Sequence, residues 1–504
     1  MPVESPAVIA SRELAFHPLS YGDPQGRLFE WEGRLYRGVR FPAGALYQRL
    51  LDEGTFQQLA KRGLLIETVK APIAVEGFEL VLQHRRADFI SYAYEWSPAM
   101  LRDAALLVLD LNLELARSGL ATQDAHPANV LFDRCRPVFV DVGSLVQAQP
   151  HRPWVAEEEF RRFYLYPLYL MAHKQGRIAR WLLHDTEGGV LPTDFYRGGR
   201  SIVPSRAGAA RAVGYRVREW TNALAPTVVS RIPPSIRGPL KQAVRSLDRT
   251  RETAALASAQ VSRVRALKRL REEIVSIRLP SPESRWSGYY DRSFPPLSPC
   301  EAWSAKHHSV WSVLARVRPK TVLDVGSNQG WYAELATTPG AAVAAVDTDE
   351  ACVTKLYERG NTASLNILPL VMDVRYPSPG SGVANECFSP ATQRLSCELV
   401  LALALIHHLV FHQNVTFDKA IRALEVFVKR WLLVEFISKD DPYVRNDWSP
   451  ERHAWYRLEE FQRVLDARFA RVERLPSDVP TRTLFLCEGP RAVRHDGVSS
   501  GVER

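Results

Sequence analysis

The sequence predicts a mixed α/β protein with an α+β N-terminal half and a C-terminal half built on a mostly parallel sheet. In the C-terminal half, apolar runs of β type alternate with helical stretches, as in strands joined by crossover helices. In the N-terminal half, short strand-like runs come first and many helical segments follow. Between the halves, the prolines and serines of residues 278–299 interrupt a long helical region. A chain of 504 residues has room for two or three such domains.

The strands of the predicted parallel sheet are short and apolar. They are expected at Thr321–Val325, Val343–Val346, Ile367–Met372, Leu399–Ala404 and Trp431–Phe436. A final hairpin is expected from about Phe469 to Glu488, with its turn in the segment PSDVPTR. The sheet is therefore expected to end in a β-hairpin.

A basic helical segment precedes the boundary between the halves. Twelve basic and four acidic residues fall between Arg231 and Arg278, with no aromatic residues among them. Apolar residues recur at helical spacing, namely Leu256, Val261, Val264, Leu267, Leu270 and Ile274. A helix that packs on one face and is solvated on the other explains this pattern, and a stripe that binds nucleic acid or an anionic membrane surface is the alternative. We expect domains at residues 1–230 and 285–490, a basic connector at 231–284 and a flexible tail at 491–504.

The composition is that of a globular protein, with 46% hydrophobic and 24% charged residues. The longest apolar run, at residues 399–406, is too short to cross a bilayer, and the N-terminus lacks the pattern of a secretory signal. Six cysteines show no CxxC pair and no metal-type spacing. These features predict a cytoplasmic protein with reduced thiols, no transmembrane segment and no structural metal.

A glycine-bearing turn follows the first strand of the C-terminal half. The segment KTVLDVGSNQGWYAEL, residues 320–335, is a buried strand, a turn and the start of a helix. Gly326 and Gly330 allow the backbone to approach a ligand at the carboxyl end of that strand. The spacing D-x-G-x-x-x-G differs from the G-x-G-x-x-G of dinucleotide-binding folds, so the turn does not favour a pyrophosphate. Asp324 suits a ligand that carries a positive amino group.

Two more acids end the next two strands. Asp347 lies 23 residues beyond Asp324, where a carboxylate can accept hydrogen bonds from both hydroxyls of a ribose. Asp373 ends the third strand, within reach of an adenine amino group. Caps and turns could explain any one of these acids, but their recurrence at three successive strand ends favours one shared ligand site.

With these residues the C-terminal half resembles the class I S-adenosylmethionine-dependent methyltransferases, which have a Rossmann-like sheet that closes in a strand hairpin. The likeness covers roughly residues 285–490, and the segments LALALIHHLV, VEFISKDDPYV and YRLEEFQRVL are similar to a nodulation-type bacterial subgroup. The resemblance implies S-adenosyl-L-methionine as cofactor. It implies that Asp324, Gly326, Ser327 and Gly330 contact the methionine part of the cofactor. It also implies that Asp347 contacts the ribose and that Asp373 and Val374 contact the adenine.

Two histidines follow the fourth strand, at the rim of this site. A sulfonium methyl is already activated, so alignment is the main requirement, and a hydroxyl acceptor would also need a base. His408 is the preferred base because the resemblance places a histidine there, with His407 as its neighbour. Glu435, on the fifth strand, is a second candidate, for binding polar groups of the acceptor. Helix capping or packing is the alternative explanation for the histidine pair.

The N-terminal half carries the segment QDAHPANVLF, followed by VFVDVGS. Asp124 is five residues before Asn129, and Asp141 is twelve residues after Asn129. This is the D-x-x-x-x-N and D-x-G pattern of protein kinases and antibiotic phosphotransferases, which the N-terminal half resembles. The resemblance implies that Asp124 orients the attacking hydroxyl and that Asn129 and Asp141 hold magnesium.

The N-terminal half departs from that family in its phosphate-binding parts. No glycine-rich loop is present, and the strand that should carry a lysine offers only Arg37 and Arg40. The first strand lies close to a helix expected around Leu46–Arg62, which leaves little room for a complete nucleotide-binding lobe. The N-terminal half therefore resembles a degenerate kinase-like domain, and ATP and magnesium are expected only if this loop is active.

These features predict methyl transfer to an oxygen or nitrogen of a small-molecule, sugar or glycan-type acceptor. One alternative is a bifunctional enzyme that both phosphorylates and methylates its acceptor. Another is a cofactor-binding regulator that contacts nucleic acid through the basic segment, although a nucleic-acid partner is not favoured. The acceptor, the pathway and the oligomeric state are not encoded in a recognisable motif.

Overall fold

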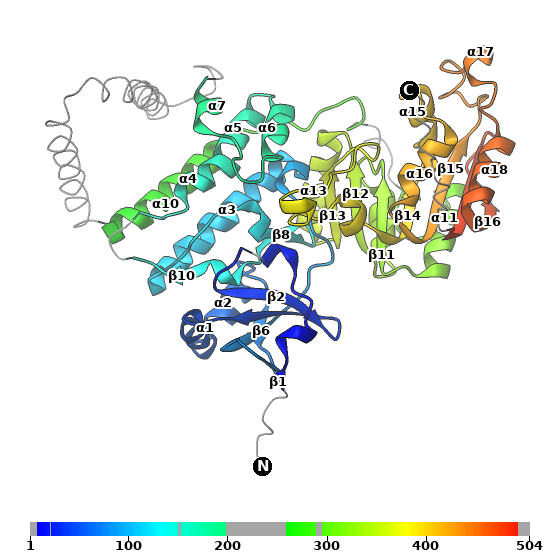
Figure 1. Ribbon diagram of the computed structural model, residues 1–504. Helices are drawn as coiled ribbons and strands as arrows, with labels where there is room; N and C mark the ends of the chain where they lie inside the picture. The colour runs from blue at the N-terminus through cyan, green and yellow to red at the C-terminus, as the bar shows by residue number, and fades with distance from the viewer. Residues whose placement is uncertain (1–7, 21, 150–152, 198–258, 289–294, 492–504) are drawn as a thin grey trace, which may run out of the picture. The chain divides into compact units, whose positions relative to one another are not determined.

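The computed structural model describes residues 8–20, 22–149, 153–197, 259–288 and 295–491 (Figure 1). Their contacts divide the chain into two compact units, which meet in sequence at Ser281 and Pro282. This division falls inside the predicted proline- and serine-rich boundary. Short segments at Asp88–Ile90 and Asp133–Cys135 group with the second unit. Within the described residues, no helix has the length and apolar character needed to span a bilayer.

The first unit begins with a four-stranded antiparallel sheet in the order β2-β3-β6-β4. The strands of this region are β1 (Val8–Ile9), β2 (Gly26–Trp31), β3 (Arg34–Val39), β4 (Thr68–Lys70), β5 (Ala74–Val75) and β6 (Leu80–His84). Glu32 and Gly33 join β2 to β3 with φ values of 48° and 73°. Two positive φ angles in a two-residue loop fit the right-handed twist of a hairpin, and Gly33 adopts its angle without strain.

Helices make up most of the remainder of the first unit. The helix expected around Leu46–Arg62 is two helices, because Gly54 adopts a left-handed conformation between α1 (Ala43–Asp52) and α2 (Thr55–Lys61). The apolar helix α3 (Pro98–Leu115) starts at a Ser97 side-chain cap. The further elements are β7 (Leu120–Thr122), β8 (Val130–Asp133), β9 (Arg136–Phe139), β10 (Leu145–Gln147), α4 (Glu157–Phe160), α5 (Tyr166–Ala172), α6 (Gly176–Leu183) and α7 (Pro192–Arg197).

The described end of the basic segment is a helix, α10 (Ala259–Ser276), that packs on α3 within the first unit. Leu267, Leu270 and Ile274 are buried, as their helical spacing predicts. The Arg271 Nε atom lies 2.6 Å from a carboxylate oxygen of Asp110 on α3. The earlier part of the predicted basic segment, and the predicted tail beyond residue 491, lie outside the described residues.

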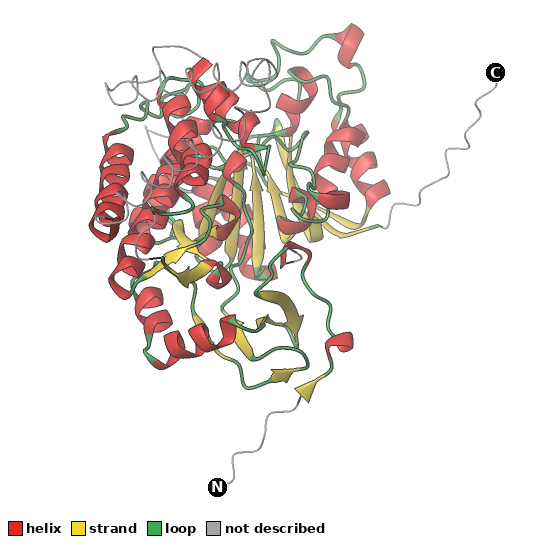
Figure 2. Cartoon of the chain, turned by 60° about the vertical axis from the view of Figure 1, so that its left-hand side comes forward, coloured by secondary structure: helices red, strands yellow, loops and turns green. Residues whose placement is uncertain are grey.

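The second unit is built on a seven-stranded sheet in the order β13-β12-β11-β14-β15-β17-β16. Figure 2 shows these strands as one continuous sheet. The strands are β11 (Thr321–Val325), β12 (Ala342–Asp347), β13 (Ile367–Val371), β14 (Cys397–Ala402), β15 (Val428–Ile437), β16 (Phe469–Leu475) and β17 (Arg482–Pro490). The first five are parallel, and β17 lies antiparallel between β15 and β16. The predicted mostly parallel sheet and its terminal hairpin are therefore present.

Helices precede, connect and follow the parallel strands of the second unit. They are α11 (Ala305–Val317), α12 (Trp331–Thr337), α13 (Glu350–Ala363), α14 (Ala391–Arg394), α15 (Ile406–Phe411), α16 (Phe417–Glu425), α17 (Pro450–His453) and α18 (Leu458–Arg468). Strand order runs outward from β11 in both directions, and right-handed crossovers then place α12 and α13 on one face and α16 on the other. The reversal lies between β11 and β14, where open α/β sheets bind ligands at the carboxyl ends of their strands.

Each strand prediction in the C-terminal half matches an observed strand within a few residues. The largest difference at a carboxyl end is in β14, which ends at Ala402 rather than at Ala404. Ala404 has a φ of 50° and belongs to the loop that leads into α15. The predicted hairpin turn matches the connection between β16 and β17.

Candidate functional site

The turn between β11 and α12 lies at the carboxyl edge of the sheet. Gly326 and Gly330 have φ values of 71° and 80°, in the left-handed region where a side chain is strained. A Cβ on Gly330 would come within 2.6 Å of Leu356, and one on Gly326 would meet Leu405 at 3.3 Å. The turn is held against β12 because the Gly326 and Ser327 amides donate to the Val346 carbonyl. These glycines therefore let the turn lie directly over the strand ends.

One polar group of this turn is buried without a partner. Ser327 is 7% exposed, and among the described residues its Oγ has no hydrogen-bond partner. A buried hydroxyl is normally bonded, because an unmade bond costs about 1–3 kcal/mol. A polar ligand beside the turn would satisfy it. The predicted donor, S-adenosylmethionine, has suitable groups in its methionine part.

Asp324 is buried at the end of β11, beside the turn. Burial, together with the negative charge of Asp347, raises the pKa of its carboxyl to about 7, although the Ala333 amide and the charge of Lys306 oppose the rise. The second unit thus places two carboxyls close together at neighbouring strand ends. A positively charged ligand would relieve their repulsion.

Asp347 ends β12, as predicted, and braces the glycine turn. One of its carboxylate oxygens accepts from the backbone N–H of Asn328 at 2.8 Å, and the other accepts from the backbone N–H of Asp349 at 2.8 Å. The Thr348 backbone N–H also donates to this carboxylate, and because a carboxylate offers about four acceptor sites, Asp347 retains capacity for a ribose hydroxyl. Asp349 has a different role, because its carboxylate caps α13 through the amides of Ala351 and Cys352.

Asp373 and Val374 follow β13. The Asp373 carboxylate is paired with its near neighbour Arg375, at 2.6 Å, and it also accepts from the Arg375 amide. Val374 is buried. The structure therefore brings a polar and an apolar group to the third strand end, and an adenine amino group would share Asp373 with the guanidinium. Their contact with adenine stays a prediction.

The two histidines of α15 have different surroundings. His407 is buried, its Nδ1 has no hydrogen-bond partner in the described part of the chain, and burial lowers its pKa to about 3. His408 is half-buried, and its ring lies 4.0 Å from that of His407 and 5.6 Å from that of Trp286. Burial lowers the pKa of His408 below 6.5, so its imidazole is neutral at pH 7 and can accept a proton.

Glu435 is fully buried in β15 and already has several hydrogen-bond partners. Lys306 Nζ, whose side chain is 7% exposed, lies 2.7 Å from one carboxylate oxygen, and the Ala404 amide donates to the same oxygen at 2.8 Å. The Ser477 hydroxyl donates to the other oxygen at 3.1 Å. Glu435 thus joins the start of α11, the loop before α15 and the turn of the hairpin. These contacts favour a positioning role over the predicted grip on the acceptor.

A short segment before α11 lies over the glycine turn. The Asn328 side chain donates to the Trp286 carbonyl at 3.4 Å, and the Gln329 side chain donates to the Ser287 carbonyl at 2.6 Å. Lys355 on α13 also donates to the Ser287 carbonyl at 2.6 Å. Because the Trp286 ring packs edge-on against His408, this segment links the turn to the predicted base.

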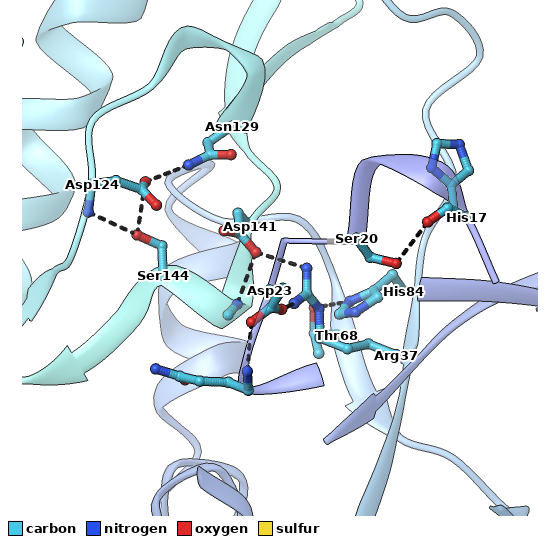
Figure 3. A network of polar contacts seen from close by, with 12 residues as sticks. His17, Ser20, Asp23, Arg37, Thr68, His84, Asp124, Asn129, Asp141 and Ser144 are labelled. Carbon is cyan, nitrogen blue, oxygen red and sulfur yellow. Dashed lines mark hydrogen bonds and ion pairs between the residues drawn. The ribbon is translucent and has the colours of Figure 1, made fainter. Parts of the chain in front are cut away.

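The predicted phosphotransfer residues lie in the first unit, with Asp124 and Asn129 just before β8 and Asp141 just after β9. Asn129 donates to the Asp124 carboxylate at 2.5 Å, and the Ser144 hydroxyl donates to it at 3.1 Å (Figure 3). Burial, together with the charges of Asp141 and Glu159, raises the pKa of Asp124 to about 7. Asp141 instead pairs with Arg37, at 2.7 Å.

Sequence reasoning missed Lys306, Trp286 and the side chains of Asn328 and Gln329. Lys306 is one lysine at the start of a helix, and its burial depends on Glu435, 129 residues further along the chain. Trp286 lies within the stretch predicted as a domain boundary. The glycine pattern located the turn but could not indicate that its two polar side chains bind a preceding segment.

Comparison with known proteins gives one extensive similarity. No protein-family model matches the chain. Nodulation protein NoeA from Rhizobium meliloti (strain 1021) is 27% identical over 444 residues, which cover 84% of this chain and 86% of NoeA. The similarity thus extends through both units.

Solved structures give weaker similarities. The bifunctional kinase-methyltransferase WbdD is 16% identical with a TM-score of 0.30, over 41% of this chain and 43% of WbdD. The magnesium protoporphyrin IX methyltransferase ChlM from Synechocystis PCC 6803, with bound SAM, is 15% identical with a TM-score of 0.26, over 36% of this chain and 78% of ChlM. TM-scores this low do not establish a shared fold, so the fold of this chain is defined by its own strand order and register.

Proposed function

We propose that the second unit is an S-adenosylmethionine-dependent methyltransferase that acts on an oxygen or nitrogen of a small-molecule, sugar or glycan-type acceptor. The observation that carries this proposal is the cluster at the carboxyl edge of β11 and β12. This edge holds a turn with two left-handed glycines and two neighbouring carboxyls. It also holds a buried hydroxyl that has no partner among the residues the structure describes. The strand order and the closing hairpin agree with the class I resemblance of the sequence.

In this proposal Asp324 would bind the amino group of the methionine part of the donor. Asp347 would bind the ribose hydroxyls, and Asp373 with Val374 would contact the adenine. When bound, the donor supplies a methyl group on a positively charged sulfur, which needs no further activation by the protein. The negative charge of the strand-end acids favours a donor that carries this positive charge. The protein then has to orient the acceptor and exclude water.

His408 accepts the proton of a hydroxyl acceptor in this proposal. It lies on α15, which follows β14, the strand beside β11 on the other side of the reversal. Its imidazole is neutral at pH 7 and half-buried, as a base needs. The Trp286 ring and the His407 ring flank it and limit its orientations. Acceptor and donor would meet between His408 and the glycine turn.

Donor binding is tested directly by Asp347→Ala. Loss of the charged hydrogen bonds to ribose is expected to weaken S-adenosylmethionine binding by about 2–3 kcal/mol, or about 30- to 150-fold. Isothermal calorimetry on the full chain measures this change. Asp349→Ala is the matched control, because Asp349 caps α13 two residues away, and it should leave donor affinity unchanged. Equal affinities for wild type and Asp347→Ala would exclude the proposed ribose contact.

Donor affinity should also depend on pH through Asp324. Its raised pKa of about 7 means that the carboxyl is partly protonated at neutral pH, and a positively charged donor binds the ionised form. Affinity is therefore expected to rise between pH 6 and pH 8, by up to about tenfold per pH unit below the pKa. The Asp324→Asn side chain cannot ionise, so the donor affinity of this variant should change with pH only through titration of the donor itself. Parallel pH profiles for the two proteins would contradict this role.

A further inference from the structure

The first unit contains a buried arginine between two carboxylates. Arg37 lies on β3 with its side chain 6% exposed. One terminal nitrogen of its guanidinium donates to Asp141 at 2.7 Å, and the other donates to Asp23. Figure 3 shows the guanidinium directed between the two acids. A planar guanidinium is suited to this bridging, since its nitrogens form a fixed fork.

The backbone around Asp141 is fitted to this arginine. The Gly143 amide donates to the Asp141 carboxylate at 3.0 Å, on the oxygen that also accepts from Arg37. A Cβ on Gly143 would clash with the nearer guanidinium nitrogen and lie 3.1 Å from Asp23. A side chain at position 143 would therefore displace the guanidinium from its present position. On the other side of the guanidinium, the Asp23 carboxylate accepts from the backbone N–H of Gln25 at 2.8 Å.

The residues that the kinase resemblance assigns to magnesium are bonded to different partners. Asn129 donates to Asp124 at 2.5 Å, whereas Asp141 accepts from Arg37. Magnesium requires oxygen ligands in near-octahedral geometry and usually retains several waters. Within the described ranges, no group of three or more histidine, cysteine or acidic side chains is arranged to hold a metal ion. As they stand, these residues do not fit the metal.

We propose that Arg37 is a built-in cation that takes the place of a divalent metal in this cluster, so that the first unit binds neither magnesium nor magnesium-ATP. The arginine neutralises one of the two acidic charges and joins the β2-β3-β6-β4 sheet to the loop that carries Asp141. Without it, two carboxylates would face each other in a partly buried site. A divalent cation would then be the simplest group to balance them.

The test uses the full chain and manganese or magnesium ions as probes. Wild type is expected to show no saturable binding of Mn²⁺, Mg²⁺ or Mg²⁺ with ATP by calorimetry. Arg37→Met, which keeps the length of the apolar stem, should gain a Mn²⁺-dependent rise in melting temperature of about 2–4 °C. The double variant Arg37→Met/Asp141→Asn should lose that rise, since Asp141 would be a ligand of the new site.

Three results would overturn the proposal. The first is saturable Mn²⁺ or Mg²⁺-ATP binding by wild type that Asp141→Asn abolishes. The second is a folded Arg37→Met that gains no response to Mn²⁺, and the third is a response that survives in the double variant. If Arg37→Met does not fold, the wild-type calorimetry with the Asp141→Asn control decides alone. The outcome is independent of methyl transfer, because neither ligand nor variant involves the second unit.

Discussion

Replacing Lys306 with methionine is expected to destabilise the second unit by about 3–5 kcal/mol. Lys306 and Glu435 form an ion pair in which both side chains are almost fully buried. Removal of the lysine leaves a buried carboxylate whose remaining partners, in the described part of the chain, are the Ala404 amide and the Ser477 hydroxyl. Hydrogen exchange on peptides from β14 and β15 of the full chain measures the change locally, as a lower free energy of opening.

Arg316→Met on the same helix is the matched control. Arg316 pairs with Glu473 at 2.9 Å, but the two side chains are 49% and 31% exposed. An exposed pair contributes about 1 kcal/mol or less, so this variant should barely change the exchange of β14 and β15. The double variant Lys306→Met/Glu435→Gln removes the unpaired charge and should recover part of the loss. If Lys306→Met cost no more than Arg316→Met, the buried pair would not stabilise the unit.

Replacing His408 with alanine is expected to reduce turnover about 10²-fold or more, with donor affinity nearly unchanged. The variant removes the proposed base but leaves the glycine turn, Asp324 and Asp347 in place. Burial lowers the pKa of His408 below 6.5. Wild-type turnover should therefore rise with pH up to this lowered pKa and be level at higher pH. The assay follows transfer from methyl-labelled donor into cell extract, with mass spectrometry to find the product.

His412→Ala serves as the control for His408. The His412 ring stacks on that of His408 at 5.4 Å, but His412 is about half exposed and follows the last residue of α15. Its removal should leave turnover close to that of wild type. Retained turnover in His408→Ala with a hydroxyl acceptor would reduce His408 to a packing residue. Loss of donor binding in the same variant would instead indicate a damaged site.

The amino-acid sequence by itself determined most of the second unit. Strands such as β11 and β12 are buried on both faces, so their apolar runs are continuous and their bounds are visible in the sequence. The carboxyl ends of parallel strands meet at one edge, so the acids that end them can be assigned to one site from the order of the strands along the chain. Gly326 and Gly330 can be placed in that site because only glycine adopts their backbone conformation readily.

Sequence pattern is less informative where contacts join distant residues. The helical spacing of the basic segment predicts that one face of it is buried, but it does not indicate that this face packs on α3, because a helix face specifies burial without naming its partner. The pattern places Glu435 toward an acceptor, and only tertiary structure brings Lys306 to it from 129 residues away. Likewise, Arg37 and Asp141 are separated by 104 residues. Local pattern identifies charged groups, whereas the folded chain decides which charges neutralise one another, because that depends on distance and burial in space.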